Sequence, residues 1–118
     1  MIKAVFDIDE RRKIASLHVN GHAGMDVEGK DIVCAAASIL SYTLAQYIKM
    51  YKDRGQLKYN PTIKINNGDA NISCIAKDDE TYAEIIHALF VIQTGFALLA
   101  HNYPRYVVVK MFGQAEKP

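Results

Sequence analysis

The chain has 118 residues, half of them hydrophobic, which is enough for one domain with its own core. Its 14 basic and 13 acidic residues leave a formal net charge of +1, so we expect no direct binding to nucleic acid. The first residues become acidic too early for a signal peptide, and no uninterrupted apolar run approaches the roughly 20 residues that a membrane span needs. We therefore expect one cytoplasmic domain over residues 1–118, without membrane contact, in which Cys34 and Cys74 stay reduced.

The N-terminal half predicts a hairpin and then a long helix. Residues 2–8 have the composition of a strand, and residues 14–20 alternate apolar and polar side chains, as a half-buried strand does. Apolar residues then recur at helical spacing from residue 31 to about residue 53. We expect Asp31 to cap this helix, which would place Cys34 in its first turn.

The C-terminal half repeats this pattern and adds one strand. Residues 58–66 and 70–76 predict strands, and the Asn-Gly pair between them is typical of a tight hairpin. A second helix is expected from its cap, Asp79, to about residue 100, and residues 106–112 predict a last strand. The order strand-strand-helix-strand-strand-helix-strand predicts an α+β domain, with a largely antiparallel sheet and two helices packed on one face.

Both predicted helices carry apolar side chains outside the stripe expected to face the sheet. These are Ile39 and Tyr42 on the first helix, and Phe90, Ile92 and Leu99 on the second. A helix that is apolar on too many sides requires a second partner surface. Because twofold dimers are the commonest oligomers, we predict a homodimer.

A glycine-rich loop separates a histidine from a cysteine twelve positions later, His22 and Cys34. A thiol attacks as the thiolate, and both a nearby imidazole and a helix N-terminus favour that form. We therefore expect Cys34 as a nucleophile, His22 as its base and N–H groups of the first helical turn as oxyanion donors. Residues 21–30 contain three glycines and are expected to form a lid that moves.

Structural roles compete with these chemical ones. Cys34 also suits simple packing as a small hydrophobe, and Cys74, alternating with apolar neighbours on one strand face, is expected to be inert. Two roles stay open for Asp31, as helix cap alone or also as the group that orients His22. Ser38, one turn after Cys34, is expected either at the site or bonded back to the helix.

No cofactor or metal is expected. His18, His22 and Cys34 are the nearest approach to a zinc ligand set, but they lack the paired spacing of zinc sites. The pair Gly21 and Gly24 lacks the following lysine of a phosphate-binding loop. The candidate chemistry is therefore that of the thiol and the imidazole alone.

Across the loop and the start of the helix the residues read Gly21-His22-Ala23, then Gly29-x-Asp31-Ile32-Val33-Cys34-Ala35-Ala36-x-Ser38. This pattern resembles the signature of the ribosomal-processing cysteine proteases, the Prp family of bacteria, and the resemblance extends over essentially the whole chain. It implies a homodimer with a mixed α/β fold. It also implies, position by position, that Cys34 is the nucleophile, His22 its base and Gly21 a support for the histidine, with Asp31 and Ser38 as the remaining polar members.

The resemblance further implies a substrate. Family members remove an N-terminal extension, ending in aromatic residues, from the precursor of the twenty-seventh large-subunit ribosomal protein. The tyrosines are then candidates for an aromatic-binding cleft: Tyr42, Tyr47, Tyr51, Tyr103 and Tyr106. Alternatives are a dimeric binding module without chemistry, associated with ribosome assembly, and a protease of a phage structural protein. Binding to ribosomal RNA is disfavoured by the near-neutral charge.

Overall fold

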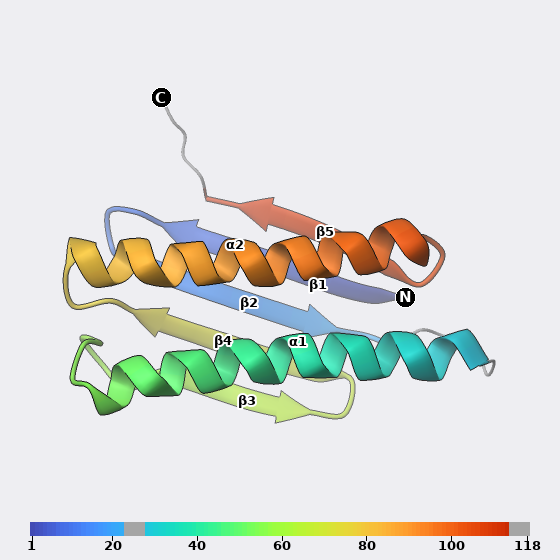
Figure 1. Cartoon of the computed structure of the whole chain (residues 1–118), viewed down its shortest axis with the longest axis horizontal. Helices are drawn as coiled ribbons and strands as arrows, with labels where there is room; N and C mark the ends of the chain where they lie inside the picture. The colour runs from blue at the N-terminus through green and yellow to red at the C-terminus, as the bar shows by residue number, and fades with distance from the viewer. Residues whose placement is uncertain (23–27, 114–118) are drawn as a thin grey trace.

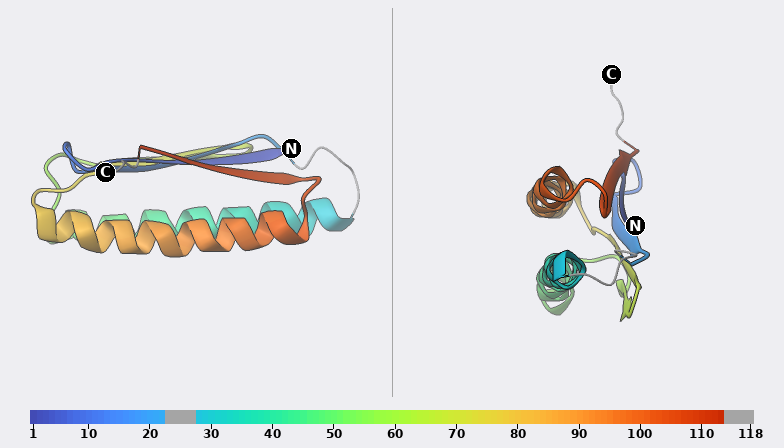
Figure 2. Two further views of the ribbon diagram at one scale, coloured as in Figure 1. Left: turned by 90° about the horizontal axis from the view of Figure 1, so that it is seen from above. Right: turned by 90° about the vertical axis from the view of Figure 1, so that its right-hand side faces the viewer.

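The computed structural model describes residues 1–22 and 28–113 and has two layers (Figure 1, Figure 2). One layer is a five-stranded sheet, and the other is a pair of long helices packed against one of its faces. The elements are β1 (Ile2–Asp9), β2 (Ile14–Asn20), α1 (Glu28–Asp53), β3 (Thr62–Asn66), β4 (Asp69–Ile75), α2 (Asp79–Asn102) and β5 (Val107–Phe112). The predicted fold class and element order are confirmed.

The sheet has the strand order β3-β4-β2-β1-β5. Both predicted hairpins form, and β2 also pairs with β4 in antiparallel orientation, whereas β1 and β5 are parallel. Asn66 pairs with Asp69 across a two-residue turn, and Asp69 in turn pairs with Asn20 at the end of β2. The end of β2 and the β3–β4 turn therefore meet at one end of the sheet, beside the start of β1.

The first helix begins earlier than predicted. α1 starts at Glu28, so Asp31 is the fourth helical residue and not the cap, and Cys34 is the seventh, in the second turn. The apolar periodicity starts only at Ile32, and a polar first turn carries no such signal. The cap prediction for Asp31 is therefore wrong. The expected lid includes residues 23–27, which lie outside the described part of the chain.

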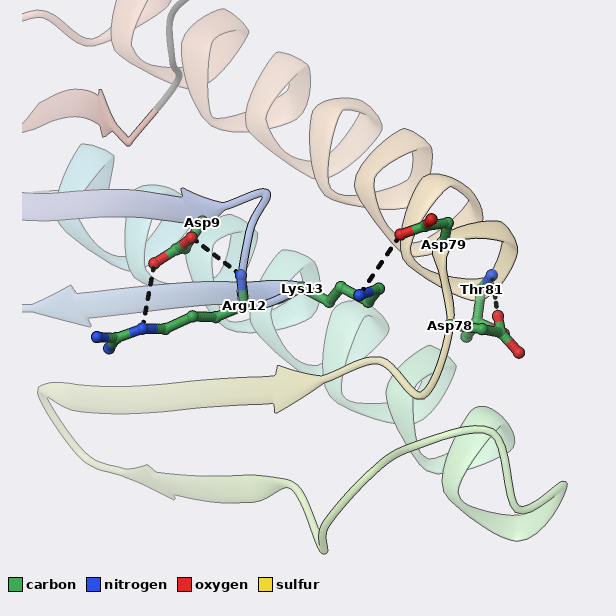
Figure 3. Close-up of polar contacts among 6 residues, drawn as sticks. All are labelled: Asp9, Arg12, Lys13, Asp78, Asp79 and Thr81. Carbon is green, nitrogen blue, oxygen red and sulfur yellow. Dashed lines mark hydrogen bonds and ion pairs between the residues drawn. The ribbon is translucent and has the colours of Figure 1, made fainter.

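The second helix is capped one residue before the predicted position. The carboxylate of Asp78 accepts a hydrogen bond of 2.8 Å from the Thr81 amide, and this bond is the main cause that lowers the pKa of Asp78 (Figure 3). Lys13, in the β1–β2 turn, lies 3.5 Å from the carboxylate of Asp79. The sequence pattern did not separate two adjacent aspartates, since either suits a helix N-terminus. β3 is also shorter than predicted, because it starts at Thr62, after Pro61.

The core lies between the helices and the sheet. Its sheet side combines small residues with fully buried Phe6, Leu17 and Ile72, and the rings of Phe6 and Phe96 meet edge to face at 5.8 Å. Cys74 is 3% exposed on this face, and burial raises its pKa to about 12. The predicted packing of Cys74 in the core is confirmed.

The helices expose part of their apolar surface. Ile39, Tyr42 and Phe90 are exposed as predicted, but Ile92 and Leu99 are 6% and 8% exposed and belong to the core. That prediction was wrong because the buried stripe of α2 includes these two positions. By helical spacing, the exposed apolar residues lie away from the buried stripes. We call them the outer helical face: Ile39, Tyr42, Phe90, Val91 and Leu98.

Both helices are long and apolar enough to pass as membrane spans by length and composition alone, over Ile32–Asp53 and Asp79–Asn102. No such segment was predicted because the sequence has no uninterrupted apolar run of that length, whereas an average over a helix tolerates isolated polar residues such as Gln93. Core helices pass the same test, and both helices bury a stripe against the sheet. The finding is weak evidence for a membrane.

Candidate active site

A cavity of about 100 Å³ opens between α1 and the end of the sheet where β2 ends and β1 begins. Four parts of the fold line it, namely one face of α1, the ends of four strands, the β3–β4 turn, and Gly21 and His22 directly after β2. The lining residues are Ile2, Val19, Gly21, His22, Cys34, Ala37, Ser38, Ser41, Ile65, Asn66, Asn67, Gly68, Asp69 and Ala70.

The cavity brings together four of the five residues that the sequence singled out. His22 and Cys34 both line it, with Gly21 and Ser38 beside them. His22 is exposed and Cys34 is half-buried, so both are accessible from the cavity. Cys34 and Cys74 are both free thiols. The side chain of the fifth residue, Asp31, lies outside the described residues, and so does the role that stayed open for it, of orienting His22.

Backbone contacts on both sides hold the segment that carries His22. Gly21 has φ +98°, and a Cβ there would lie 2.2 Å from the carbonyl oxygen of Met1, so only glycine fits. The Gly21 amide donates to the Gly68 carbonyl at 3.0 Å, and the amino group of Met1 donates to the His22 carbonyl. These contacts explain why the position before the histidine is a glycine.

The position of Cys34 in α1 changes the expected oxyanion chemistry. Only the first four amides of a helix lack intrahelical partners, and Cys34 is the seventh residue of α1. Its amide pairs with a carbonyl four residues earlier in a regular helix, and the effect of the helix dipole falls off within the first turn. The Cys34 amide is therefore not among the first-turn N–H groups that were expected as oxyanion donors.

Two serines follow Cys34 on the cavity side of α1. Ser38 is exposed and lines the cavity one turn after the thiol. Ser41 is buried, and its hydroxyl donates to the Ala37 carbonyl at 2.9 Å. Ser41 therefore makes the bond back to the helix that was one of the two roles expected for Ser38.

The apolar part of the cavity comes from residues that the sequence analysis missed. Ile2, Val19 and Ile65 line it, from the ends of three different strands. Their only sequence signal was their position beside the Asn-Gly hairpin and the glycine loop, because strand register decides which strand ends meet. None of the tyrosines named as candidates lines this cavity.

Two of those tyrosines belong to a hydrogen-bond network between the two helices. The hydroxyls of Tyr47 and Tyr51 lie 3.0 Å apart, and Tyr51 donates to a carboxylate oxygen of Glu84 on α2 at 2.6 Å. Burial is the main cause that raises the pKa of Tyr51, and the hydrogen bond to Glu84 is the second. This network joins the two helices at a distance from the thiol.

Among the side chains that the structure describes, in residues 1–22 and 32–113, no three from His, Cys, Asp or Glu gather as metal ligands do. His18, one member of the weak zinc candidate, instead places Nε2 3.0 Å from the Asp69 carboxylate. Both side chains are partly exposed, and the pair links β2 to β4.

The chain matches the family model of the cysteine protease Prp over residues 1–108. Among solved structures, it resembles SMU.848 from Streptococcus mutans at 26% identity and a TM-score of 0.68, with 97% of this chain and 96% of that one covered. It also resembles the S. aureus ribosomal processing protease Prp in complex with a substrate peptide, at 19% identity and a TM-score of 0.66, with 95% and 100% covered. The same protease with a covalently linked product peptide gives 21% identity, a TM-score of 0.66 and the same coverage.

At these identities the two S. aureus structures show a common fold. No match was found among curated proteins. The family match spans most of the chain and includes both the glycine loop and α1. This chain therefore belongs to the Prp family of cysteine proteases.

Proposed function

We propose that this protease removes the N-terminal extension from the precursor of the twenty-seventh large-subunit ribosomal protein, with Cys34 as nucleophile and His22 as base. The observation that carries the proposal is that both side chains line one cavity at the end of the sheet. The half-buried thiol of Cys34 can be reached by a substrate from outside, as a nucleophile must be. The exposed imidazole of His22 can exchange protons with water, as a base must.

The proposed reaction has two stages. The sulfur of Cys34 attacks the scissile carbonyl carbon while His22 takes the thiol proton. The C–N bond then breaks, the imidazolium gives its proton to the leaving amine, and the acyl group stays on sulfur as a thioester. Water attacks the thioester with His22 again accepting a proton, which releases the carboxyl product and restores the thiol.

The apolar side of the cavity supports an aromatic residue before the cut. Ile2, Val19 and Ile65 line one side of the cavity with aliphatic side chains. Ile2 and Val19 are 3% and 8% exposed, so the half-buried Ile65 offers most of the apolar area that a substrate side chain would bury. The S. aureus relative was solved with a substrate peptide and with a covalently linked product peptide. A peptide substrate for this chain, attached for part of the cycle through Cys34, is consistent with that relative.

The proposed assembly is a homodimer in the cytoplasm. The outer helical face exposes Ile39 and Val91 at 63% and 69%, which is unfavourable in water. An apolar groove of about 320 Å³ runs between the helices and includes Leu44 and Val91. A second copy that presents the same face would cover both features through one twofold interface. A reducing compartment would keep Cys34 in its thiol form.

The test is mass spectrometry of the precursor after incubation with the wild-type chain or with Cys34→Ala. A discrete N-terminal truncation is expected with the wild type and not with Cys34→Ala. Cys34→Ser should be severely impaired, because a serine hydroxyl is not ionised in this environment as a thiol can be. Cys74→Ala is the matched control, since it removes the other thiol at a site away from the cavity. This variant should still cleave the precursor. Truncation by Cys34→Ala would overturn the assignment of Cys34 as the nucleophile. If the wild type does not truncate the precursor, the substrate assignment is overturned.

A further inference from the structure

The imidazole of His22 lies against the β3–β4 turn. A Cβ built on Gly68 would stand 2.5 Å from Nε2 and 2.6 Å from Cε1 of His22, so the ring edge occupies the space that a side chain would need. Any residue other than glycine would therefore force the ring away from the turn. The contact joins residues 46 positions apart in the chain, at the cavity that also holds Cys34.

The same turn also holds the backbone before His22. The Gly68 carbonyl accepts the 3.0 Å hydrogen bond from the Gly21 amide. Asp69 pairs with Asn20 in the β2–β4 ladder, so the turn is in register with the residues that lead into His22. One glycine therefore contacts the histidine ring directly and bonds to the residue preceding it.

We propose that the β3–β4 turn is the positioning element for His22, and that Gly68 is the residue against which the imidazole is aligned toward the cavity shared with Cys34. The proposal rests on the proposed function in taking His22 as the base. Gly68 itself touches neither the thiol nor the scissile bond in this role. It acts by leaving the space that the ring occupies, since the backbone of a glycine lets the ring lie closer than any side chain would.

Two demands on Gly68 must be separated in a test. Its φ of +82° is a left-handed conformation that strains other residues, and the ring leaves no room for a Cβ. Gly55 makes the separation possible, because it has φ +71° and nothing lies within 4 Å of its Cβ position. Gly55→Ala therefore carries the backbone strain alone, whereas Gly68→Ala carries the strain and the clash with His22.

The experiment compares Gly68→Ala and Gly55→Ala in the full chain by three measurements. These are the melting temperature, kcat and KM on a peptide spanning the precursor cut, and the NMR signal of the His22 Cε1 proton. Both variants should lose similar thermal stability. Only Gly68→Ala should lose kcat, by roughly ten- to a hundredfold as for a catalytic group misplaced by about 1 Å, with KM changed much less. Only Gly68→Ala should shift the His22 signal.

Gly68→Asn is the second variant, because asparagine accepts a left-handed φ more readily than alanine but still has a Cβ. It should fold at least as well as Gly68→Ala and show the same loss of kcat, so the test holds even for a Gly68→Ala chain too unstable to assay. Unchanged kcat and an unshifted His22 signal in a folded Gly68 variant would overturn the proposal. An inactive wild type would contradict the proposed function instead, and the His22 signal would still decide the positioning role.

Discussion

Gly95 on α2 lies so close to Leu40 on α1 that a Cβ at Gly95 would stand 2.7 Å from Cδ2 of that leucine. Glycine inside a helix costs about 1 kcal/mol relative to alanine, so its presence in the middle of α2 needs a reason. The contact supplies one, because the missing side chain lets Leu40 lie directly on the backbone of the second helix. The close approach of α1 and α2 therefore depends on a residue that is unfavourable for α2 alone.

We expect Gly95→Ala to be nearly neutral in the wild-type chain. The gain in helix propensity of about 1 kcal/mol is offset by the displacement of Leu40, whose partly buried tip must shift to make room for the new Cβ. In a Leu40→Ala background the clash is absent, and the same substitution should stabilise the protein by about 1 kcal/mol. Urea unfolding of the four chains of this double-mutant cycle measures the coupling.

Equal effects of Gly95→Ala in the two backgrounds would show that the contact is energetically irrelevant. Gly55→Ala serves as a control, because its Cβ position is open and its effect should not depend on residue 40. Strong destabilisation in both backgrounds would point to a cause in α2 itself.

The two cysteines are expected to differ sharply toward iodoacetamide. Cys34 is accessible from the cavity beside His22, whereas Cys74 is 3% exposed with a pKa raised to about 12 by burial. At a pH of about 6 to 7, the native chain should therefore take one label, at Cys34, and faster than a free cysteine does. Peptide mapping by mass spectrometry identifies the labelled site.

Unfolding in urea provides the control for this experiment, because both thiols should then react. Cys34→Ala should remain unlabelled in the native state, and His22→Ala should label more slowly if the imidazole activates the thiol. Labelling of Cys74 at a rate comparable with Cys34 in the native chain would contradict the buried position of that residue.

The fold was largely predictable because local signals determine it. Alternation gave β2, the Asn-Gly pair gave the β3–β4 hairpin, and helical spacing gave both helices. The start of α1 was missed, since the polar turn from Glu28 adds nothing to the apolar pattern. Ile92 was placed on the wrong side of α2 because a helix rich in apolar residues fits more than one stripe.

The candidate site was predictable only in part, for a different reason. His22 and Cys34 flank one loop, so their sequence spacing already allowed them to meet. Gly68 and Ile65 reach the same cavity only through the register of β3, β4 and β2, which the sequence pattern does not specify. Residues that join a site through tertiary pairing of distant segments leave no spacing signal in a single sequence.

The proposed dimer is expected to use the outer helical face. Val91 is 69% exposed and also lines the groove between the helices, so Val91→Glu should leave the monomer fold intact while placing a charge in the interface. Light scattering after size exclusion should give a dimer mass for the wild type and a monomer mass for Val91→Glu. Tyr59→Glu is the matched control, because Tyr59 is 62% exposed and lies outside both helices.

Tyr59→Glu should keep the dimer mass. A monomer mass for the wild type at micromolar concentration would contradict the proposed assembly. A dimer that survives Val91→Glu and is disrupted by Tyr59→Glu would place the interface on another surface.

The Asp78 cap predicts how acid affects the stability of α2. Hydrogen bonds from the Thr81 amide, and then from its side chain, lower the pKa of Asp78 below its ordinary value of 3.8 (Figure 3). A carboxyl whose pKa is lower in the folded state contributes stability that is fully present above its unfolded pKa and is lost as the pH falls through its folded pKa. This contribution should therefore be complete at neutral pH and fade below about pH 4.

Thermal unfolding of wild type, Asp78→Asn and Asp78→Ala between neutral pH and about pH 3 measures this effect. Asparagine still accepts the Thr81 bond but does not titrate, so the advantage of wild type over Asp78→Asn should shrink as the pH falls, because a protonated aspartate resembles asparagine. Asp78→Ala lacks the acceptor at every pH and should melt below Asp78→Asn throughout. A gap between wild type and Asp78→Asn that stays constant over this range would show that the charge of Asp78 is not what the Thr81 amide stabilises.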